Sequence, residues 1–308
     1  MKNLLTLSIG LLLAHAAFCI SPKERRNVSD FLQDISVTIR SEGDYSKSEG
    51  SGVLITREVE GEKITFVWTC GHVVDNVREI RTKIEGGMPK KSVEFDDVQI
   101  IKELVEDGRR VGEMKMSAVV IKYSDADIGE DLALLMVRAK DYGKASAKFY
   151  LEKEDPIVPI GTPLFHVGSL LGQFGSNSMT SGIVSQVGRI RNKIEYDQTT
   201  VTAFPGSSGG GVYLQDGRYV GMIVRGAGEG FNLMVPVRRM IRWAKEHDIM
   251  WAIDPKAKTP TLKEILSLPV ENSSKGEEDS KPKSKKKEAD ALGINKLPFL
   301  IKVDKLEE

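Results

Sequence analysis

Short runs of β-branched and aromatic residues recur from about residue 50 to residue 236, and glycine-rich turns separate them. Together they predict strands at residues 52–56, 64–68, 93–100, 114–121, 132–137, 163–167, 182–187, 193–196, 211–214, 219–224 and 231–236. The Asp107-Gly108 pair predicts a hairpin turn between the third and fourth of these runs. Many short strands separated by turns are typical of an all-β sandwich or barrel.

The periodicity changes to that of a helix at residues 237–247. One face of this segment carries Val237, Met240, Ile241 and Ala244, and the other carries Arg238, Arg239, Arg242 and Lys245. Such a pattern predicts one amphipathic helix at the end of the β-rich region. We therefore expect a single domain over residues 28–253, entered through a short amphipathic segment at residues 28–40.

The N-terminus has the pattern of a secretory signal peptide. A positive start at Met1-Lys2 precedes an apolar run from Leu4 to Ala17, and Ala14-His15-Ala16 has the spacing of a cleavage site. The run is shorter than the roughly 20 apolar residues that cross a membrane. We expect residues 1–20 to direct export, which places the mature chain in the periplasm or outside the cell.

The chain has two cysteines, Cys19 and Cys70, too few for a disulfide framework. A cysteine that closes a signal segment is a potential lipid acceptor in bacteria, and lipidation of Cys19 is the one route by which we expect a membrane partner. Phe18 departs from the small residue that normally precedes such a cysteine. A Cys19–Cys70 bridge is the other possibility.

Charge argues against a nucleic-acid partner, because Lys and Arg together number 44 and so do Asp and Glu. Beyond residue 253 the composition changes, and residues 273–290 are charged and almost free of apolar side chains. Such a stretch buries too little apolar surface to offset the entropy of ordering. We expect residues 254–308 to form a charged, largely disordered tail whose basic run at 281–287 is a solvated linker.

Three local patterns contain residues suited to acyl transfer. Thr69-Cys-Gly-His-Val-Val74 follows a predicted strand and contains one of the four histidines in the chain. Asp131 stands at the start of a continuous apolar run, where a carboxylate is costly unless it is paired or hydrogen-bonded. Phe204-Pro-Gly-Ser-Ser-Gly-Gly210 places a serine pair between glycines, directly before a predicted strand.

A nucleophilic serine needs a tight, exposed turn from which its hydroxyl projects while backbone N–H groups converge on the developing oxyanion. The Phe204–Gly210 segment has the residues for such a turn. The three patterns occur in the order His, Asp, Ser, and each lies beside a predicted strand. Together they indicate a catalytic triad more strongly than any one of them alone.

The TCGHVV, DLALL and GSSGG segments resemble the three catalytic motifs of chymotrypsin-like serine proteases, and of the HtrA-type proteases in particular. The resemblance implies two six-stranded β-barrels followed by a C-terminal helix. It assigns His72 as the general base, Asp131 as the group that orients it, and Ser208 as the nucleophile. The backbone N–H groups of Gly206 and Ser208 would form the oxyanion hole.

The resemblance covers about residues 35–250 and includes the glycine-rich Gly168–Gly175 loop and the Thr180–Ser185 segment after it. Residues 254–308 are too short and too charged to supply the PDZ-like domain of many relatives. The implied activity is that of a serine endopeptidase working through an acyl-enzyme on a protein or peptide substrate. No metal or organic cofactor is expected.

The resemblance also locates the primary specificity pocket. Its floor would be Thr202, six residues before the nucleophile, and its walls would include Val224, Gly226 and Gly230. An uncharged floor leaves a buried Lys or Arg of the substrate without a partner, at a large desolvation cost. We expect cleavage after apolar residues, and we expect the neighbouring Arg225 to point to solvent.

Two alternatives remain open at this stage. Gly206–Gly210 also satisfies Gly-x-Ser-x-Gly, the nucleophile elbow of esterase-type α/β-hydrolases, and His247 follows it in the required order. That fold needs a helix after the serine, whereas Gly211–Leu214 is β-rich. A non-catalytic binding protein built on a protease fold is the second alternative. The physiological substrate and the oligomeric state are not encoded in any recognisable pattern.

Overall fold

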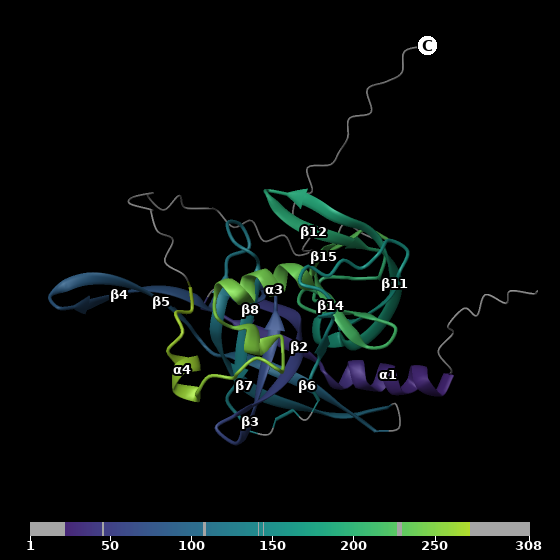
Figure 1. Ribbon diagram of the computed structural model, residues 1–308. Helices are drawn as coiled ribbons and strands as arrows, with labels where there is room; N and C mark the ends of the chain where they lie inside the picture. The colour runs from purple at the N-terminus through teal and green to yellow at the C-terminus, as the bar shows by residue number, and fades with distance from the viewer. Residues whose placement is uncertain are drawn as a thin grey trace, which may run out of the picture.

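The computed structural model describes residues 22–44, 46–106, 109–140, 142–143, 145–226 and 230–271. The segment expected as a signal peptide, Cys19 and the charged stretch at 273–290 lie outside these residues. Within them, two β-sheet bodies pack side by side with helices at their margins (Figure 1). The predicted all-β class is therefore confirmed, and no described helix is long and apolar enough to cross a membrane.

The first body is a closed barrel with the strand order β1-β2-β3-β8-β7-β6. Its strands are β1 (Ser36–Glu42), β2 (Lys47–Val59), β3 (Glu62–Thr69), β6 (Val98–Glu106), β7 (Arg109–Ser124) and β8 (Leu132–Val137). Every residue of β8 is buried, as its continuous apolar sequence predicts. The expected turn residues Asp107 and Gly108 are not described, but Glu106 pairs with Arg109 across that position.

The second body has the order β13-β10-β11-β12-β15-β14-β9, and an additional β13–β14 pairing closes six of these strands into a ring. Its strands are β9 (Lys148–Phe149), β10 (Pro163–Leu170), β11 (Gly175–Arg191), β12 (Ile194–Thr199), β13 (Gly211–Leu214), β14 (Arg218–Gly226) and β15 (Asn232–Pro236). The two predicted six-stranded barrels are thus present.

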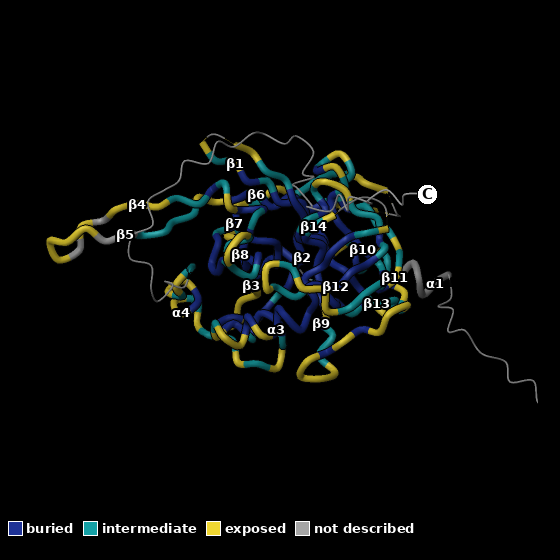
Figure 2. The backbone as a smooth tube through the Cα atoms, turned by 90° about the horizontal axis from the view of Figure 1, so that it is seen from above, coloured by how far each residue is buried: buried dark blue, intermediate teal, exposed yellow. Residues whose placement is uncertain are grey.

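A two-stranded arm, β4 (Arg78–Glu85) and β5 (Met88–Phe95), extends away from both barrels (Figures 1 and 2). The sequence analysis did not predict it, because its residues are largely polar and exposed and show no buried face. We expected one strand over residues 93–100, but that run divides between β5 and β6. The division falls at Asp96-Asp97, and aspartate is disfavoured in strands.

The helices lie at the edges of the barrels. They are α1 (Pro22–Asp34), α2 (Gly71–Val74), α3 (Val237–Glu246) and α4 (Leu262–Leu266), with short 3₁₀ turns η1 (Asp75–Val77), η2 (Gly172–Phe174) and η3 (Met250–Ala252). The segment expected at residues 28–40 forms the end of α1 and most of β1.

The predicted closing helix is present as α3, but part of the face that was predicted to be polar and exposed is buried. Arg238 and Arg239 were expected on the polar side, yet both are buried. Arg238 pairs with Asp197 of β12 at 2.7 Å, and Arg239 pairs with Glu130 at 2.5 Å. Buried ion pairs of this kind depend on a tertiary neighbour, which the helical periodicity of the sequence cannot reveal.

The domain boundary also differs from the expected one at residue 254. Helix α4 buries Ile265 against the core and begins with a capping box between Thr261 and Glu264. The Val270 carbonyl then accepts a hydrogen bond from the Tyr123 N–H at 2.9 Å. Residues 254–271 therefore belong to the folded body, and a charged tail begins no earlier than residue 272.

Candidate active site

The three sequence patterns meet where the two barrels face each other. Strand β3 ends at Thr69, and α2 follows at once with His72 near its start. The Phe204–Gly210 segment, which carries Ser207 and Ser208, is called the serine turn. Gly50 of β2 lies between α2 and the serine turn. A Cβ added there would come within 2.6 Å of Val73 and 3.1 Å of the Ser208 carbonyl oxygen. Glycine at position 50 is what allows the two segments to come so close.

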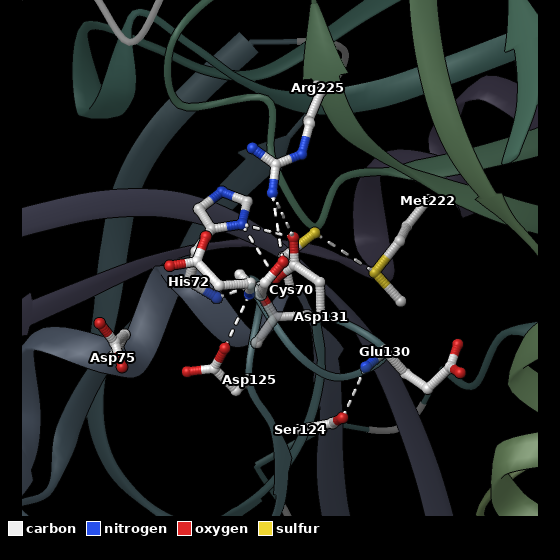
Figure 3. Close-up of polar contacts among 12 residues, drawn as sticks. Cys70, His72, Asp75, Ser124, Asp125, Glu130, Asp131, Met222 and Arg225 are labelled. Carbon is white, nitrogen blue, oxygen red and sulfur yellow. Dashed lines mark hydrogen bonds and ion pairs between the residues drawn. The ribbon is translucent and has the colours of Figure 1, made fainter. Parts of the chain in front are cut away.

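His72 and Asp131 form a directly bonded pair (Figure 3). The Nδ1 of His72 lies 3.0 Å from each carboxylate oxygen of Asp131, and the His72 backbone N–H donates to Oδ1 at 3.0 Å. Asp131 is completely buried, whereas the His72 side chain is 35% exposed. With Nδ1 occupied by the carboxylate, Nε2 is the ring nitrogen left to exchange a proton with another group.

The environment keeps Asp131 ionised. Burial raises the pKa of this carboxyl, but the charge and hydrogen bonds of His72, together with the charge of Arg225, outweigh burial and hold the pKa below its usual value. Asp131 adopts a left-handed backbone conformation with a φ of 53°. Its orientation is therefore set by the surrounding structure rather than by local preference.

We expected Arg225 to point to solvent, but its side chain turns towards Asp131. Its Nη2 atom lies 3.8 Å from Oδ2 of Asp131 and 3.5 Å from the Ala126 carbonyl oxygen (Figure 3). A cation at this distance favours the ionised form of the buried carboxylate. Sequence position alone could not show that this side chain turns towards the pair.

The serine turn holds its carbonyl groups firmly in place. Four successive carbonyl oxygens accept hydrogen bonds: Pro205 from Leu171 N–H, Gly206 from Ser51 Oγ, Ser207 from Gly210 N–H and Ser208 from Ser51 N–H. The distances are 2.8, 2.7, 2.9 and 2.7 Å respectively. With these four carbonyls bonded, none of them is left to turn into the space in front of Ser208.

The N–H groups of the same turn divide into two sets. Those of Ser207 and Gly209 donate to carbonyls at 2.9 and 2.8 Å. Within the described residues, the N–H groups of Gly206 and Ser208 have no intramolecular partner. Because N–H and C=O point opposite ways in a trans peptide, the bonded carbonyls of Pro205 and Ser207 fix the direction of each of these two N–H groups. They are the pair that the resemblance assigns to an oxyanion hole.

The adjacent serines have different surroundings. Ser207 is 1% exposed, and its Oγ accepts a hydrogen bond from the Phe204 N–H at 3.1 Å. Ser208 is partly exposed. The buried hydroxyl therefore supports the turn, and the exposed one is available for chemistry.

Three side chains with metal-binding atoms also gather here. These atoms of Cys70, His72 and Asp131 lie within 4.8 Å of one another. The Cys70 thiol donates to the Ile223 carbonyl at 3.3 Å, and burial raises its pKa well above the usual value. Metals bind the thiolate, which this setting disfavours. Cys70 is a free thiol, and its possible partner Cys19 lies outside the described residues.

The residues expected around the specificity pocket lie in β14, just before β15 and in the segment before the serine turn. Val224 is 2% exposed, Thr202 is partly buried, and Gly226 and Gly230 are exposed. The sequence analysis missed Asn232, which is fully buried beside Gly226.

Asn232 contributes a polar group to this region. A Cβ on Gly226 would lie 2.6 Å from its Oδ1 atom. Its Nδ2 donates to the Val201 carbonyl at 2.7 Å, while Oδ1 has no partner among the described residues. Nothing in the local sequence around Asn232 indicates this position, which follows from the pairing of β14 with β15.

Comparison with known proteins agrees with this geometry. Residues 50–222 match the family described as the trypsin-like peptidase domain, which is more than half of the 308 residues. The chain belongs to this family. Trypsin-like peptidases are hydrolases, so the acyl-transfer chemistry inferred from the motifs agrees with the family. No curated protein matches the chain.

Solved structures of peptidases share the fold. The serine endoprotease from Yersinia pestis has a TM-score of 0.52 at 15% identity, with 74% of this chain and 68% of that chain covered. The HtrA-type protease AlgW with a tripeptide has a TM-score of 0.52 at 20% identity, with coverages of 79% and 72%. At these identities the likeness concerns the fold alone, and it supports the predicted chymotrypsin-like two-barrel fold.

His166 lies directly behind the serine turn and makes the fold sensitive to acid. It is fully buried, its Nδ1 lies 3.0 Å from the Gly211 carbonyl oxygen, and its Nε2 has no partner among the described residues. Burial lowers the pKa of His166 from 6.5 to about 4, although the hydrogen bond to Gly211 opposes this. Between these two pH values the His166 imidazole is protonated in the unfolded chain and neutral in the folded chain, so the free energy of unfolding falls as pH falls.

We therefore predict that His166 alone removes about 2 kcal/mol of unfolding free energy between pH 7 and pH 5. Urea unfolding at both pH values would measure this loss in the parent protein and in His166→Gln. The variant should lose correspondingly less stability on acidification. An equal loss in both proteins would show that His166 is not the group responsible.

Proposed function

We propose that this trypsin-like peptidase is a serine endopeptidase in which Ser208 is the nucleophile, His72 the general base and Asp131 the group that orients His72. The observation that carries the proposal is the bonded His72–Asp131 pair beside a turn with two N–H groups free to donate hydrogen bonds to an oxyanion. The substrate class is protein or peptide, as the family indicates.

The proposed reaction follows from the positions of the donors. Ser208 Oγ attacks the peptide carbonyl while Nε2 of His72 takes its proton, and the N–H groups of Gly206 and Ser208 stabilise the resulting oxyanion. The tetrahedral intermediate then loses its C–N bond as His72 protonates the leaving amine. Water, activated by His72, repeats the sequence on the ester and releases Ser208. Asp131 stays ionised throughout and stabilises the imidazolium.

The fold removes one alternative and the site weakens the other. An α/β-hydrolase needs a helix after the nucleophile, whereas Ser208 precedes strand β13 in a two-barrel fold. A non-catalytic binding protein would be favoured by a collapsed oxyanion hole. Here the four bonded carbonyls of the turn argue against such a collapse.

The triad assignment predicts that Ser208→Ala abolishes peptide hydrolysis and fluorophosphonate labelling without unfolding the protein. Ser207→Ala is the matched control: it should keep its label, because the Ser207 hydroxyl only accepts a bond from Phe204. His72→Ala should be as inactive as Ser208→Ala, and Asp131→Asn should lose about 10⁴-fold in kcat through the wrong imidazole tautomer. Full activity in purified Ser208→Ala would refute the assignment.

We further propose that the enzyme cleaves after apolar residues of modest size. No described charged side chain lies among the pocket residues Thr202, Val224, Gly226 and Asn232, so a buried substrate Lys or Arg would find no counter-charge there. The fully buried Asn232 side chain, set against Gly226, narrows the space left for a substrate side chain.

Cleavage-site profiling of a peptide library would test this specificity. We expect small or medium aliphatic residues before the scissile bond and a rejection of Lys and Arg, because burying an unpaired charge is costly. Asn232→Ala should admit larger apolar residues at that position. A dominant preference for a basic residue would show that the pocket is assigned wrongly, even with the triad correct.

Export is the third part of the proposal, and the N-terminal sequence supports it. The positive start, the apolar run of residues 4–17 and the small residues at 14–16 form the pattern of a signal peptide. N-terminal sequencing of protein recovered outside the cytoplasm should find a mature end between Ala17 and Ser21. A soluble cytoplasmic protein that retains Met1 would contradict export.

A further inference from the structure

Ser51 of strand β2 is a buried hydroxyl that contacts the serine turn on both sides of Ser208. Its Oγ donates to the Gly206 carbonyl at 2.7 Å, and its N–H donates to the Ser208 carbonyl at 2.7 Å. Ser51 itself is completely buried. One residue of the first barrel therefore holds two carbonyl groups of a turn that belongs to the second barrel.

The same hydroxyl is also an acceptor. Ser51 Oγ accepts a hydrogen bond from the Ser169 N–H at 2.7 Å, which brings the end of β10 against the serine turn. Two residues further on, the Leu171 N–H donates to the Pro205 carbonyl at 2.8 Å. Leu171 has a left-handed φ of 62°, so its amide is held in this direction by the surrounding structure.

Strand β2 is itself fixed in position by further contacts. The Ser51 carbonyl accepts from Thr69 Oγ1 at 2.8 Å, which ties it to the segment that carries His72. Glu49 accepts from the Gln173 N–H at 3.0 Å and pairs with Arg40 at 2.6 Å. Residues 49–51 therefore bind the Gly168–Gly175 loop on one side and the catalytic segments on the other.

Gly206 fits this arrangement only as glycine. It has a φ of 94°, and a Cβ there would lie 2.5 Å from the Gly172 nitrogen. Its carbonyl is bonded by Ser51, while its N–H belongs to the peptide whose carbonyl is bonded by Leu171. The two peptides meet at the Cα of Gly206. Loss of the Ser51 bond leaves the Gly206–Ser207 peptide held by the Ser207 N–H bond to the Phe204 carbonyl alone, and so loosens the adjoining peptide that carries the Gly206 N–H.

We propose that Ser51 is a positioning residue for the oxyanion hole: its hydroxyl joins the Gly206 carbonyl to the Ser169 amide and so fixes the Gly206–Ser207 peptide, which adjoins the peptide that carries the Gly206 N–H. This inference rests on the proposed serine peptidase function and adds to it a residue that touches neither substrate nor the reacting atoms. The effect belongs to the transition state, because a ground-state peptide carbonyl needs the hole less than the oxyanion does.

The test is steady-state kinetics on a peptide substrate with Ser51→Ala. We expect kcat to fall about 10- to 100-fold with KM changed by less than about twofold, since losing a whole oxyanion donor costs about 10²–10³. A peptide aldehyde, whose hemiacetal places an oxyanion in the hole, should bind more weakly by a similar factor. Ser51→Cys, with a weaker donor, should lie between the two proteins.

Thr65→Val is the matched control for loss of a buried hydroxyl. Thr65 is also fully buried on a neighbouring strand, but its Oγ1 accepts from the Gly143 N–H and not from the serine turn. It should lower the melting temperature as Ser51→Ala does, yet leave kcat and aldehyde binding unchanged. If Ser51→Ala does not fold, Ser51→Cys is judged by the same criteria.

The outcomes separate this inference from the proposed function. An inactive parent protein that takes no fluorophosphonate label would overturn the function itself. An active parent whose Ser51 variants keep kcat and aldehyde affinity within about twofold would overturn only the role of Ser51. A rise in KM at constant kcat would do the same, because it would mean lost ground-state binding.

Discussion

The close approach of strand β2 to the serine turn is the constraint on which the rest of the site depends. The two barrels are separate sheets. They are joined at the site by hydrogen bonds between strand β2 of the first barrel and the serine turn of the second. A Cβ at Gly50 would lie 2.6 Å from Val73, and one at Gly52 would lie 2.5 Å from Val67, so both positions need glycine. Between them, the buried Ser51 has room to bond the turn. A side chain at Gly50 would crowd the Ser208 carbonyl oxygen and disturb the hydrogen bonds that hold the turn, whereas one at Gly52 would disturb the packing of the first barrel.

Burial of Asp131 is the second organising element. An ionised carboxylate without exposure to water is tolerated only when its partners compensate for the lost hydration. His72 supplies those partners through its ring and its backbone, and Arg225 adds a positive charge at 3.8 Å. The need for compensation orients the imidazole with Nδ1 towards Asp131, and this leaves Nε2 as the ring nitrogen that is not bonded to the carboxylate. The same contacts therefore compensate the buried charge of Asp131 and set the orientation of the His72 ring.

Much of this could be predicted from the sequence. The all-β class and helix α3 follow from strand and helix patterning, while the two barrels and the meeting of His72 with Asp131 follow from the family that the three local motifs resemble. What could not be predicted depends on tertiary neighbours. Arg225 turns towards Asp131, Arg238 is buried against Asp197, and Asn232 lies behind Gly226, although none of these residues differs in its local sequence from an ordinary surface position. The β4–β5 arm was missed for a related reason, because a hairpin without a buried face has no hydrophobic alternation to detect.

The hydrogen bonds of Ser51 connect very distant parts of the chain. Its hydroxyl reaches Gly206 across 155 positions and Ser169 across 118. Contacts of such separation form late, since the loop-closure entropy must first be met by other native contacts. A chain in which only the first barrel has folded has His72 in place but lacks the turn with Ser208. If Ser208 is the nucleophile, as proposed, hydrolytic activity arises only at the end of folding, and a partly folded molecule cannot digest its neighbours or itself.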